Sequence, residues 1–131
     1  PVQQEKPVVS DASERQIFMR NNVRYVKVQS GDTYKTLEEL YEIRKWQVLK
    51  YNDKASGALL TPGEIIYLQP KRNSNPQHEY HFVAGGETLK GISQQYGIKL
   101  AKLYRYNDLT TGEEPAIGQK VWLRKRKRNE L

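Results

Sequence analysis

The sequence predicts an α+β fold in which two small strand–helix–helix–strand units follow one another in tandem. The first observation is an internal repeat: residues 25–69, moved forward by 55 positions, align with residues 80–124 without a gap and with 13 identities in 45 positions. The second is that each copy passes from a β-rich segment to helical spacing and back. The third is that glycine-containing turns fall at the same places in both copies. The identical pairs are Tyr25/Tyr80, Val28/Val83, Gly31/Gly86, Thr33/Thr88, Lys35/Lys90, Tyr41/Tyr96, Ile43/Ile98, Tyr51/Tyr106, Asn52/Asn107, Asp53/Asp108, Gly57/Gly112, Gly63/Gly118 and Leu68/Leu123.

The first strand and the first helix of each unit meet at a glycine turn. Residues 25–29 and 80–84 have the composition of strands, and Gly-Asp-Thr or Gly-Glu-Thr follows shortly after each segment. Asp32 or Thr33 in the first copy, and Thr88 in the second, stand where a side chain caps a helix by accepting free backbone N–H groups. Apolar residues then recur at helical spacing, namely Tyr34, Leu37 and Tyr41, matched by Leu89, Ile92 and Tyr96.

A second helix and a closing strand complete each unit. A break at residues 42–43 or 97–98 precedes a shorter helix, which ends at an Asn-Asp pair in both copies, and a polar loop leads to a closing strand. Because the two strands can pair antiparallel with both helices on one face, the sequence predicts compact βααβ modules. We expect core packing to account for most of the shared tyrosines, which are Tyr25, Tyr41, Tyr51, Tyr80, Tyr96 and Tyr106.

A short hairpin precedes the first unit only. Two strand-like segments flank Asn21-Asn22, and Asn tolerates the positive φ that two-residue hairpin turns need. Because the chain begins with Pro rather than Met, we expect a fragment or a processed product. The predicted division is a linker at 1–15, a first module with its hairpin at 16–70, a polar linker at 71–78, a second module at 79–124 and a basic tail at 125–131.

The net charge of +7 lies mostly at one end of the chain. Residues 124–128 supply five of these charges, which leaves +2 for the rest. Such a run is either a solvated tail or an attraction to a polyanion such as nucleic acid or an anionic envelope. No apolar run approaches the roughly 20 residues of a membrane span, and there is no cysteine.

The residue types do not favour catalysis, metal binding or a cofactor. His78 and His81 fall at the start of a strand, where alternation sends successive side chains to opposite faces, so a shared metal is not expected. No serine has a repeated partner that could act as a base. Asp32 and Asp53 could form a carboxylate pair for glycoside hydrolysis, but aspartates in turns more often cap helices. We therefore expect no catalytic residues, no metal site and no cofactor.

The ordered motifs resemble the LysM family of small glycan-binding modules. The first copy contains Val28 three positions before the glycine of the Gly-Asp-Thr turn, then Tyr-Asn-Asp and Pro-Gly-Glu-Ile. The second contains Gly-Glu-Thr-Leu, Tyr-Gly-Ile, Tyr-Asn-Asp and Gly-Gln-Lys-Val. Each motif is common alone, but their order recurs in both copies. The resemblance covers residues 24–69 and 79–124 and extends to the tandem LysM tails of bacterial cell-wall glucosaminidases.

The resemblance implies a βααβ fold and a glycan groove between the turn after the first strand and the loop after the second helix. In such a groove, backbone N–H and C=O groups meet the acetamide of N-acetylglucosamine, and glycines allow close approach. The implied binding residues of the first copy are Gly31, Asp32, Thr33, Tyr34, Asn52, Asp53, Leu60 and Pro62. Those of the second copy are Gly86, Glu87, Thr88, Leu89, Asn107, Asp108, Leu109 and Ile117.

The expected function is non-catalytic binding of an N-acetylglucosamine polymer, either peptidoglycan or a chitin-like glycan. The resemblance further implies a catalytic domain upstream in a longer chain and a bacterial envelope location, periplasmic or secreted. We expect a monomer, no membrane span and no specific nucleic-acid partner; polyanion binding through the basic tail is the alternative function. Tyr34, Glu42, Trp46 and Glu64 depart from the family pattern. We therefore expect the second copy to be the better binder.

Overall fold

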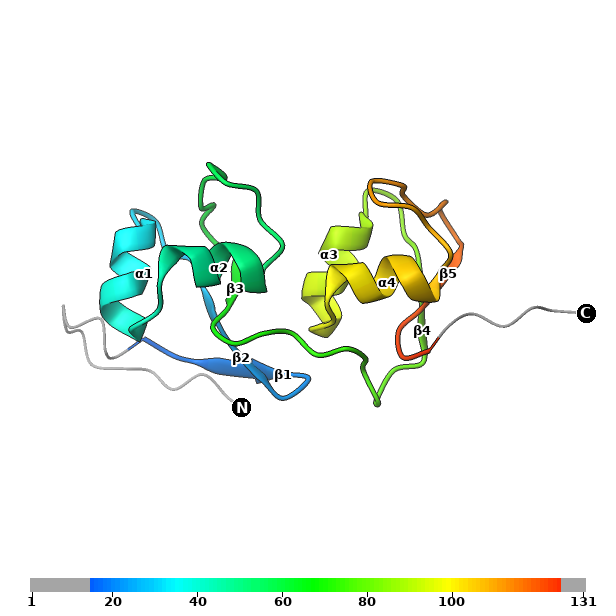
Figure 1. The fold of residues 1–131 in the computed structure, drawn as a ribbon, viewed down its shortest axis with the longest axis horizontal. Helices are drawn as coiled ribbons and strands as arrows, with labels where there is room; N and C mark the ends of the chain where they lie inside the picture. The colour runs from blue at the N-terminus through cyan, green and yellow to red at the C-terminus, as the bar shows by residue number, and fades with distance from the viewer. Residues whose placement is uncertain (1–14, 126–131) are drawn as a thin grey trace, which may run out of the picture.

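A computed structural model describes residues 15–125 of the 131-residue chain. The predicted linker at 1–15 and basic tail at 125–131 lie, except for Arg15 and Lys125, outside the described residues. The predicted α+β class is confirmed: two βααβ modules stand side by side along the long axis of the molecule (Figure 1). No helix in the described part of the chain is long and apolar enough to cross a membrane.

The first module is a three-stranded antiparallel sheet with two helices on one side. Its elements are β1 (Phe18–Arg20), β2 (Val23–Lys27), α1 (Tyr34–Tyr41), α2 (Lys45–Tyr51) and β3 (Ile65–Tyr67), and the strand order is β1-β2-β3. The hairpin prediction is confirmed. Asn21 and Asn22 form its turn with φ values of 51° and 63°, as expected for the turns that match strand twist.

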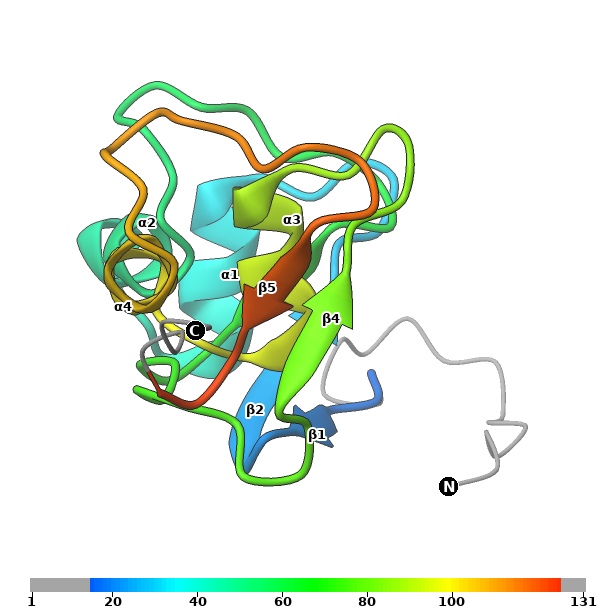
Figure 2. The same cartoon turned by 90° about the vertical axis from the view of Figure 1, so that its right-hand side faces the viewer.

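The second module repeats this plan without the hairpin. Its elements are β4 (Tyr80–Phe82), α3 (Leu89–Tyr96), α4 (Leu100–Tyr106) and β5 (Lys120–Trp122), and β4 pairs with β5 antiparallel. Seen end-on, α3 lies in front of α1 and α4 in front of α2, and the loops above the helices are on the same side (Figure 2). The second module therefore repeats the orientation of the first.

Each module has its own hydrophobic core under the helices. Leu37, Val48 and Ile66 are fully buried in the first, and Ile92, Leu103 and Val121 take the same repeat positions in the second. The apolar side of each helix thus packs against the inner face of the sheet in its module. Modules this small bury a modest core, so the polar contacts that join elements carry extra weight.

Tyr80 is the exception among the shared tyrosines, because it is exposed while Tyr25, Tyr41, Tyr51 and Tyr96 are buried in or packed against the cores. Tyr25 is buried beneath Phe18 of β1, with ring centroids 5.2 Å apart, but its counterpart Tyr80 is 40% exposed. The second module has no strand equivalent to β1 among the described residues, so nothing covers this face of its sheet. A repeated residue is therefore buried only where its surroundings are repeated as well.

The helix breaks use the left-handed conformation in both copies. Thr88 caps α3 through its side-chain oxygen, as predicted, and of the two predicted candidates for α1 it is Thr33, not Asp32, that forms the cap. The helices then end at Glu42 and Gly97, with φ values of 54° and 69°. Glycine is the usual residue at this point, and a residue with a Cβ is strained there.

The modules are joined by a polar interface in which Lys71 is central. Lys71 is 3% exposed, and its Nζ donates to Asp53 Oδ2 at 2.7 Å, to Ser93 Oγ at 2.6 Å and to Gln94 Oε1 at 2.8 Å. Burial lowers the pKa of Lys71, and Asp53 opposes that effect. One lysine from the segment between the modules therefore ties a residue of the first module to two on α3.

Further hydrogen bonds hold the same interface. The Gln94 amide donates to Asn52 Oδ1 at 3.0 Å and to Ile65 O at 3.1 Å, and the Tyr67 hydroxyl donates to Gln94 O. Burial raises the pKa of Tyr67 to about 12, so this hydroxyl remains a donor at neutral pH. At the hairpin, Asn21 Nδ2 donates to Gly97 O at 3.1 Å. These bonds cross between modules at several points, which fixes their relative orientation.

Candidate functional site

In the first module the structure brings together the two loops predicted to frame the site. The backbone of Val28, just before the first loop, bonds to two residues at the end of the second loop. Its N–H donates to Glu64 O at 2.9 Å, and its C=O accepts from Gly63 N–H at 2.7 Å. The Tyr34 hydroxyl also donates to Ala58 O at 2.6 Å. We refer to residues 29–34 and 52–64 as the first loop pair.

The second module has the same arrangement. Val83 N–H donates to Gln119 O at 3.0 Å, and Gly118 N–H donates to Val83 O at 2.7 Å. The N-terminus of α3 is joined to the opposite loop by Leu89 N–H, which donates to Glu114 Oε1 at 2.7 Å. Residues 84–89 and 107–119 form the second loop pair.

The glycines of the two turns leave open backbone at each loop pair. Gly31 and Gly86 have φ values of 89° and 83°, and a Cβ added to either would meet no atom within 4 Å. Their conformation therefore requires glycine, while the space beside them stays free. Thr33 and Thr88 are exposed next to them and also cap the helices.

Asp32 is occupied by an ion pair that the sequence did not reveal. Both Asp32 oxygens accept from Arg15 at 2.8 Å, and one also accepts from Gln29 N–H at 2.8 Å. Burial raises the pKa of Asp32, but these bonds outweigh it and bring the pKa below its usual value. Arg15 falls in the predicted linker, 17 residues away, where no local pattern marks it as a partner.

Glu87, at the equivalent position, makes a different set of contacts. Its carboxylate accepts from Ala84 N–H at 2.8 Å and lies 2.8 Å from His81 Nε2. The pKa of Glu87 is lowered, mainly by the bond from the Ala84 N–H and to a lesser degree by the contact with His81. His81 Nδ1 lies 2.7 Å from the Tyr96 hydroxyl, so this histidine ties the turn to α3. Both acidic side chains at this position organise the turn.

Two other predicted residues, Asn52 and Asn107, hold each second helix to the closing strand. Asn52 is 0% exposed; its amide donates to Val48 O and Tyr67 O, and its Oδ1 accepts from Tyr67 N–H at 2.7 Å. Asn107 is 2% exposed and makes the same three contacts with the C-terminal part of its own module. All of these side-chain bonds are made within the fold, so the two asparagines position the loop that follows each of them.

The remaining predicted residues differ in exposure. Asp53 binds Lys71, and Asp53 and Asp108 have positive φ values of 51° and 54°. Leu89 is fully buried, and Tyr34, Leu60 and Leu109 are partly buried against the cores. The predicted residues that the structure leaves exposed are Gly31, Thr33, Asp53, Pro62, Gly86, Thr88, Asp108 and Ile117.

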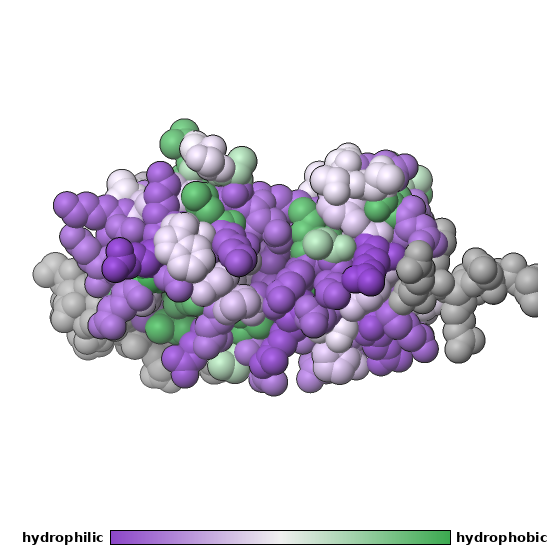
Figure 3. Space-filling model, viewed as in Figure 1, coloured by the Kyte–Doolittle hydropathy of each residue, from purple (hydrophilic) through white to green (hydrophobic). Residues whose placement is uncertain are grey.

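Apolar side chains project from the tips of both loop pairs. Leu59 is 83% exposed and Ile117 is 76% exposed. The face shown in Figure 3 is mainly hydrophilic, and hydrophobic atoms gather at the tip of the loop between α2 and β3. Sequence reasoning missed Leu59 and its repeat counterpart Glu114. Their alignment at one position, next to the predicted residues of the loop, is the signal that could have found them.

The geometry defines a pair of non-identical βααβ modules, each with one apposed loop pair. In the described residues, no three His, Asp or Glu side chains gather as ligands of a metal would. The LysM domain family matches residues 26–69 and 81–124. The chain therefore belongs to the LysM domain family, whose modules are binding domains and carry no catalytic machinery of their own.

Several proteins are similar to this chain. The autolysin of Enterococcus faecalis (strain ATCC 700802 / V583) is 26% identical over 115 residues, which are 77% of this chain and 15% of that protein. The crystal structure of the Bacillus cereus spore cortex-lytic enzyme SleL is 27% identical, with a TM-score of 0.34 over 80% of this chain and 24% of that chain. The corresponding enzyme of Bacillus megaterium QM B1551 is 13% identical, with a TM-score of 0.34 over 79% of this chain and 23% of that one.

Proposed function

We propose that the two loop pairs bind N-acetylglucosamine units of bacterial peptidoglycan. The observation that carries this proposal is the composition of the loop pairs: open glycine backbone, fixed helix N-termini and an exposed apolar residue at each tip. An acetamide group needs one donor, one acceptor and an apolar surface for its methyl group; the open backbone at Gly31 and Gly86 would supply the polar partners, and Leu59 or Ile117 the apolar surface. Membership of the LysM family supports the same ligand class.

We further propose that the chain holds an attached cell-wall hydrolase on its substrate. The similarity to an autolysin supports this role. The matched region is 15% of that protein, which is the proportion expected of a binding region within a longer chain. A bacterial cell-wall location, periplasmic or secreted, follows from the proposed ligand. Two weak sites on one rigid unit raise the apparent affinity through effective concentration, which gives the duplication a purpose.

The test is co-sedimentation of the purified chain with insoluble peptidoglycan. We expect sedimentation that soluble N-acetylglucosamine oligomers compete away. Deleting residues 126–131 serves as the control for the alternative, polyanion binding through the tail. If that deletion abolishes sedimentation, or if high salt abolishes it while the oligomers never compete, binding is electrostatic and the proposal is wrong.

A further inference from the structure

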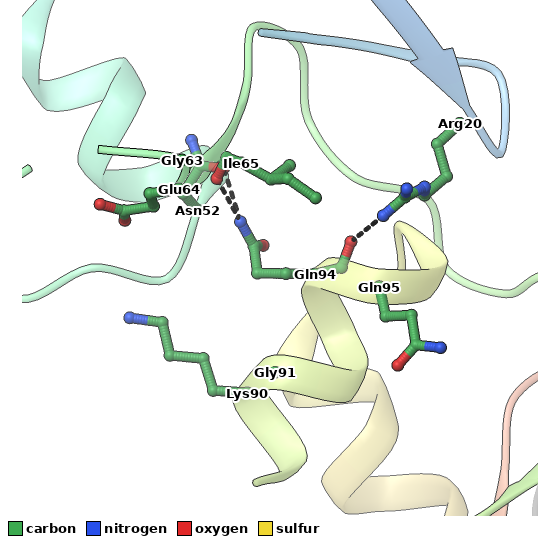
Figure 4. Close-up of a pocket in the computed structure, with 9 residues that line it drawn as sticks. All are labelled: Arg20, Asn52, Gly63, Glu64, Ile65, Lys90, Gly91, Gln94 and Gln95. Atoms are coloured by element: carbon green, nitrogen blue, oxygen red, sulfur yellow. Dashed lines mark hydrogen bonds between the residues drawn. The ribbon is translucent and has the colours of Figure 1, made fainter. Parts of the chain in front are cut away.

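A pocket of about 340 Å³ lies between the two modules. Figure 4 shows that both modules contribute to it: Arg20, Glu64 and Ile65 come from the first, and Lys90, Gln94 and Gln95 from α3 of the second. Neither module has this pocket alone. It exists because the bonds of Lys71 and Gln94 hold the modules in one orientation, so its walls are fixed before any ligand arrives.

The acidic groups at the pocket are already neutralised. The Glu64 carboxylate pairs with Lys54 Nζ, and its other oxygen accepts from Thr61 N–H at 2.9 Å. Asp53, on the same side of the interface, is paired with Lys71 at 2.7 Å. Neither carboxylate is therefore free to balance a further cation.

Two cations at the pocket have no carboxylate partner within residues 15–125. The Arg20 guanidinium donates only to oxygens of neutral groups, Gln94 O at 3.5 Å and the Tyr25 hydroxyl at 3.3 Å. Lys90 is partly buried and makes no hydrogen bond or ion pair in this part of the chain. Figure 4 shows its side chain extending from α3 toward the first module. The pocket therefore carries a net positive charge over a partly apolar wall at Ile65.

The pocket adjoins both loop pairs. Asn52, Gly63 and Glu64 of the first loop pair line it, and Lys90 directly follows Leu89 of the second. Because Gly63 and Glu64 belong both to the first loop pair and to the pocket wall, a glycan bound at that loop pair would lie beside the pocket that Arg20 and Lys90 also line. An acidic substituent on that glycan would find two unpaired cations beside it.

We propose that this pocket binds a carboxylate carried by the glycan, with Lys90 as its main contact. This inference rests on the proposed glycan-binding function and adds a chemical preference to it. Chitin oligomers are neutral, whereas peptidoglycan carries free carboxylates on its peptide stems and, where a stem has been removed, on the lactyl group of N-acetylmuramic acid. The pocket therefore selects acidic glycan over neutral glycan.

The internal repeat supplies a matched control for the test. Lys35 is the counterpart of Lys90, at the same position of α1, but it is exposed and does not line the pocket. Lys90→Gln and Lys35→Gln thus remove the same charge from equivalent helices. Only the first variant removes it from the space between the modules.

Affinities of both variants would be measured by calorimetry with three probes: an N-acetylglucosamine oligomer, a stem-free oligomer containing N-acetylmuramic acid, and the same oligomer with peptide stems. We expect K90Q to weaken binding of the stem-free acidic oligomer by about fivefold, with the neutral oligomer unchanged. K35Q should bind all three as the parent does. A loss by K90Q confined to the stem-bearing probe would support the pocket and assign the carboxylate to the peptide.

The proposal is overturned if K90Q binds every probe like the parent protein, or loses the neutral oligomer equally. A second measurement separates it from the proposed function. Titration with N-acetylmuramic acid and, in parallel, N-acetylglucosamine as monosaccharides should shift the NMR signals of Lys90 and Gln94 with the acid only. If the acid leaves these signals unmoved, the pocket is no carboxylate site, whatever the loop pairs bind.

Discussion

The two modules have the same fold but differ in two local features, the cover of the sheet and the residue that ends the first helix. The outer face of the first sheet is covered by β1, while in the second module Tyr80 and Phe82 stay 40% and 57% exposed, with Lys120 Nζ 4.4 Å from the Tyr80 ring centroid. The first helix ends on Glu42 in one module and on Gly97 in the other. The comparison teaches that the repeat preserves backbone geometry and lets side chains adapt to neighbours.

The loop pairs differ in the same way. In the first, the Tyr34 hydroxyl occupies Ala58 O, and in the second, Glu114 occupies the N–H of Leu89. A phenol therefore spans the first loop pair, whereas a carboxylate on an exposed loop does so in the second. We infer that the second loop pair opens to ligand more readily, because a surface carboxylate exchanges with solvent at low cost.

The largest expected effect concerns the asparagines that hold the closing strands. Asn107→Ala should destabilise the second module by about 2–3 kcal/mol, since it leaves the backbone N–H and C=O of Trp122 without the partner that Asn107 gives them. Asn52→Ala should cost more, because Asn52 also accepts from Gln94 across the interface. Urea unfolding followed through Trp122 or Trp46, one in each module, measures both; equal losses would argue against the interface contribution.

The helix breaks should give the next largest effect. Gly97→Ala should cost about 2 kcal/mol, because the added Cβ is strained at φ 69° and would lie 3.0 Å from Asn21 Cβ. Gly112→Ala is the control: its φ is 92°, and the added Cβ would meet nothing within 4 Å. If the control loses less stability, the difference measures the clash with Asn21 of the first module. Equal losses of stability would show that this clash contributes nothing.

The converse substitution should stabilise the first module. Glu42→Gly removes the strain of a Cβ at a left-handed position and should raise the free energy of unfolding by about 0.5–1 kcal/mol. Thermal unfolding monitored at Trp46 gives the change. A loss of stability would mean that the Glu42 side chain makes a contribution larger than its strain.

The Arg15–Asp32 pair of the first module predicts a pH dependence of its stability. Arg15→Gln should cost about 1 kcal/mol at pH 7. Because the folded pKa of Asp32 lies below its unfolded value, the stabilisation is present above the unfolded pKa and is lost as pH falls through the folded pKa. Urea unfolding from pH 7 down to pH 2 should therefore bring parent and variant together at the acid end. A constant difference across that range would contradict the ion pair.

The smallest expected effect is on ligand affinity at the first loop pair. Tyr34→Leu introduces the residue of the second copy and frees Ala58 O, so we expect about threefold tighter binding of an N-acetylglucosamine oligomer there. Leu89→Tyr is the reciprocal variant and should weaken the second loop pair. NMR titration reads each module separately, and unchanged affinities in both variants would show that this position does not set the difference.

The repeat and local patterns predicted the elements of the fold, but not the contacts between them. Asn21-Asn22 and the threonine caps act over a few residues, so their roles are visible in sequence. Lys71 joins residues 18, 22 and 23 positions away, and no periodicity marks such a bond. Its burial follows from the docking of two folded modules.

The candidate site was predictable to the level of the backbone. The repeat located both loop pairs, because the glycine turn and the Asn-Asp helix end are conserved between copies. It could not separate residues that build the loops from residues that stay exposed, since an aspartate or asparagine suits both tasks. Asp32 and Asn52 are engaged in contacts within the fold, whereas Leu59, next to a predicted residue of the same loop, is exposed.

The central claim is that two glycan sites of unequal strength lie at the loop pairs. Residue-by-residue NMR titration with N-acetylglucosamine oligomers of increasing length tests it most directly. We expect signals of residues 84–89 and 107–119 to shift first, followed by those of residues 29–34 and 52–64 at higher concentration. Shifts confined to other surfaces, or none at any oligomer length, would contradict the claim.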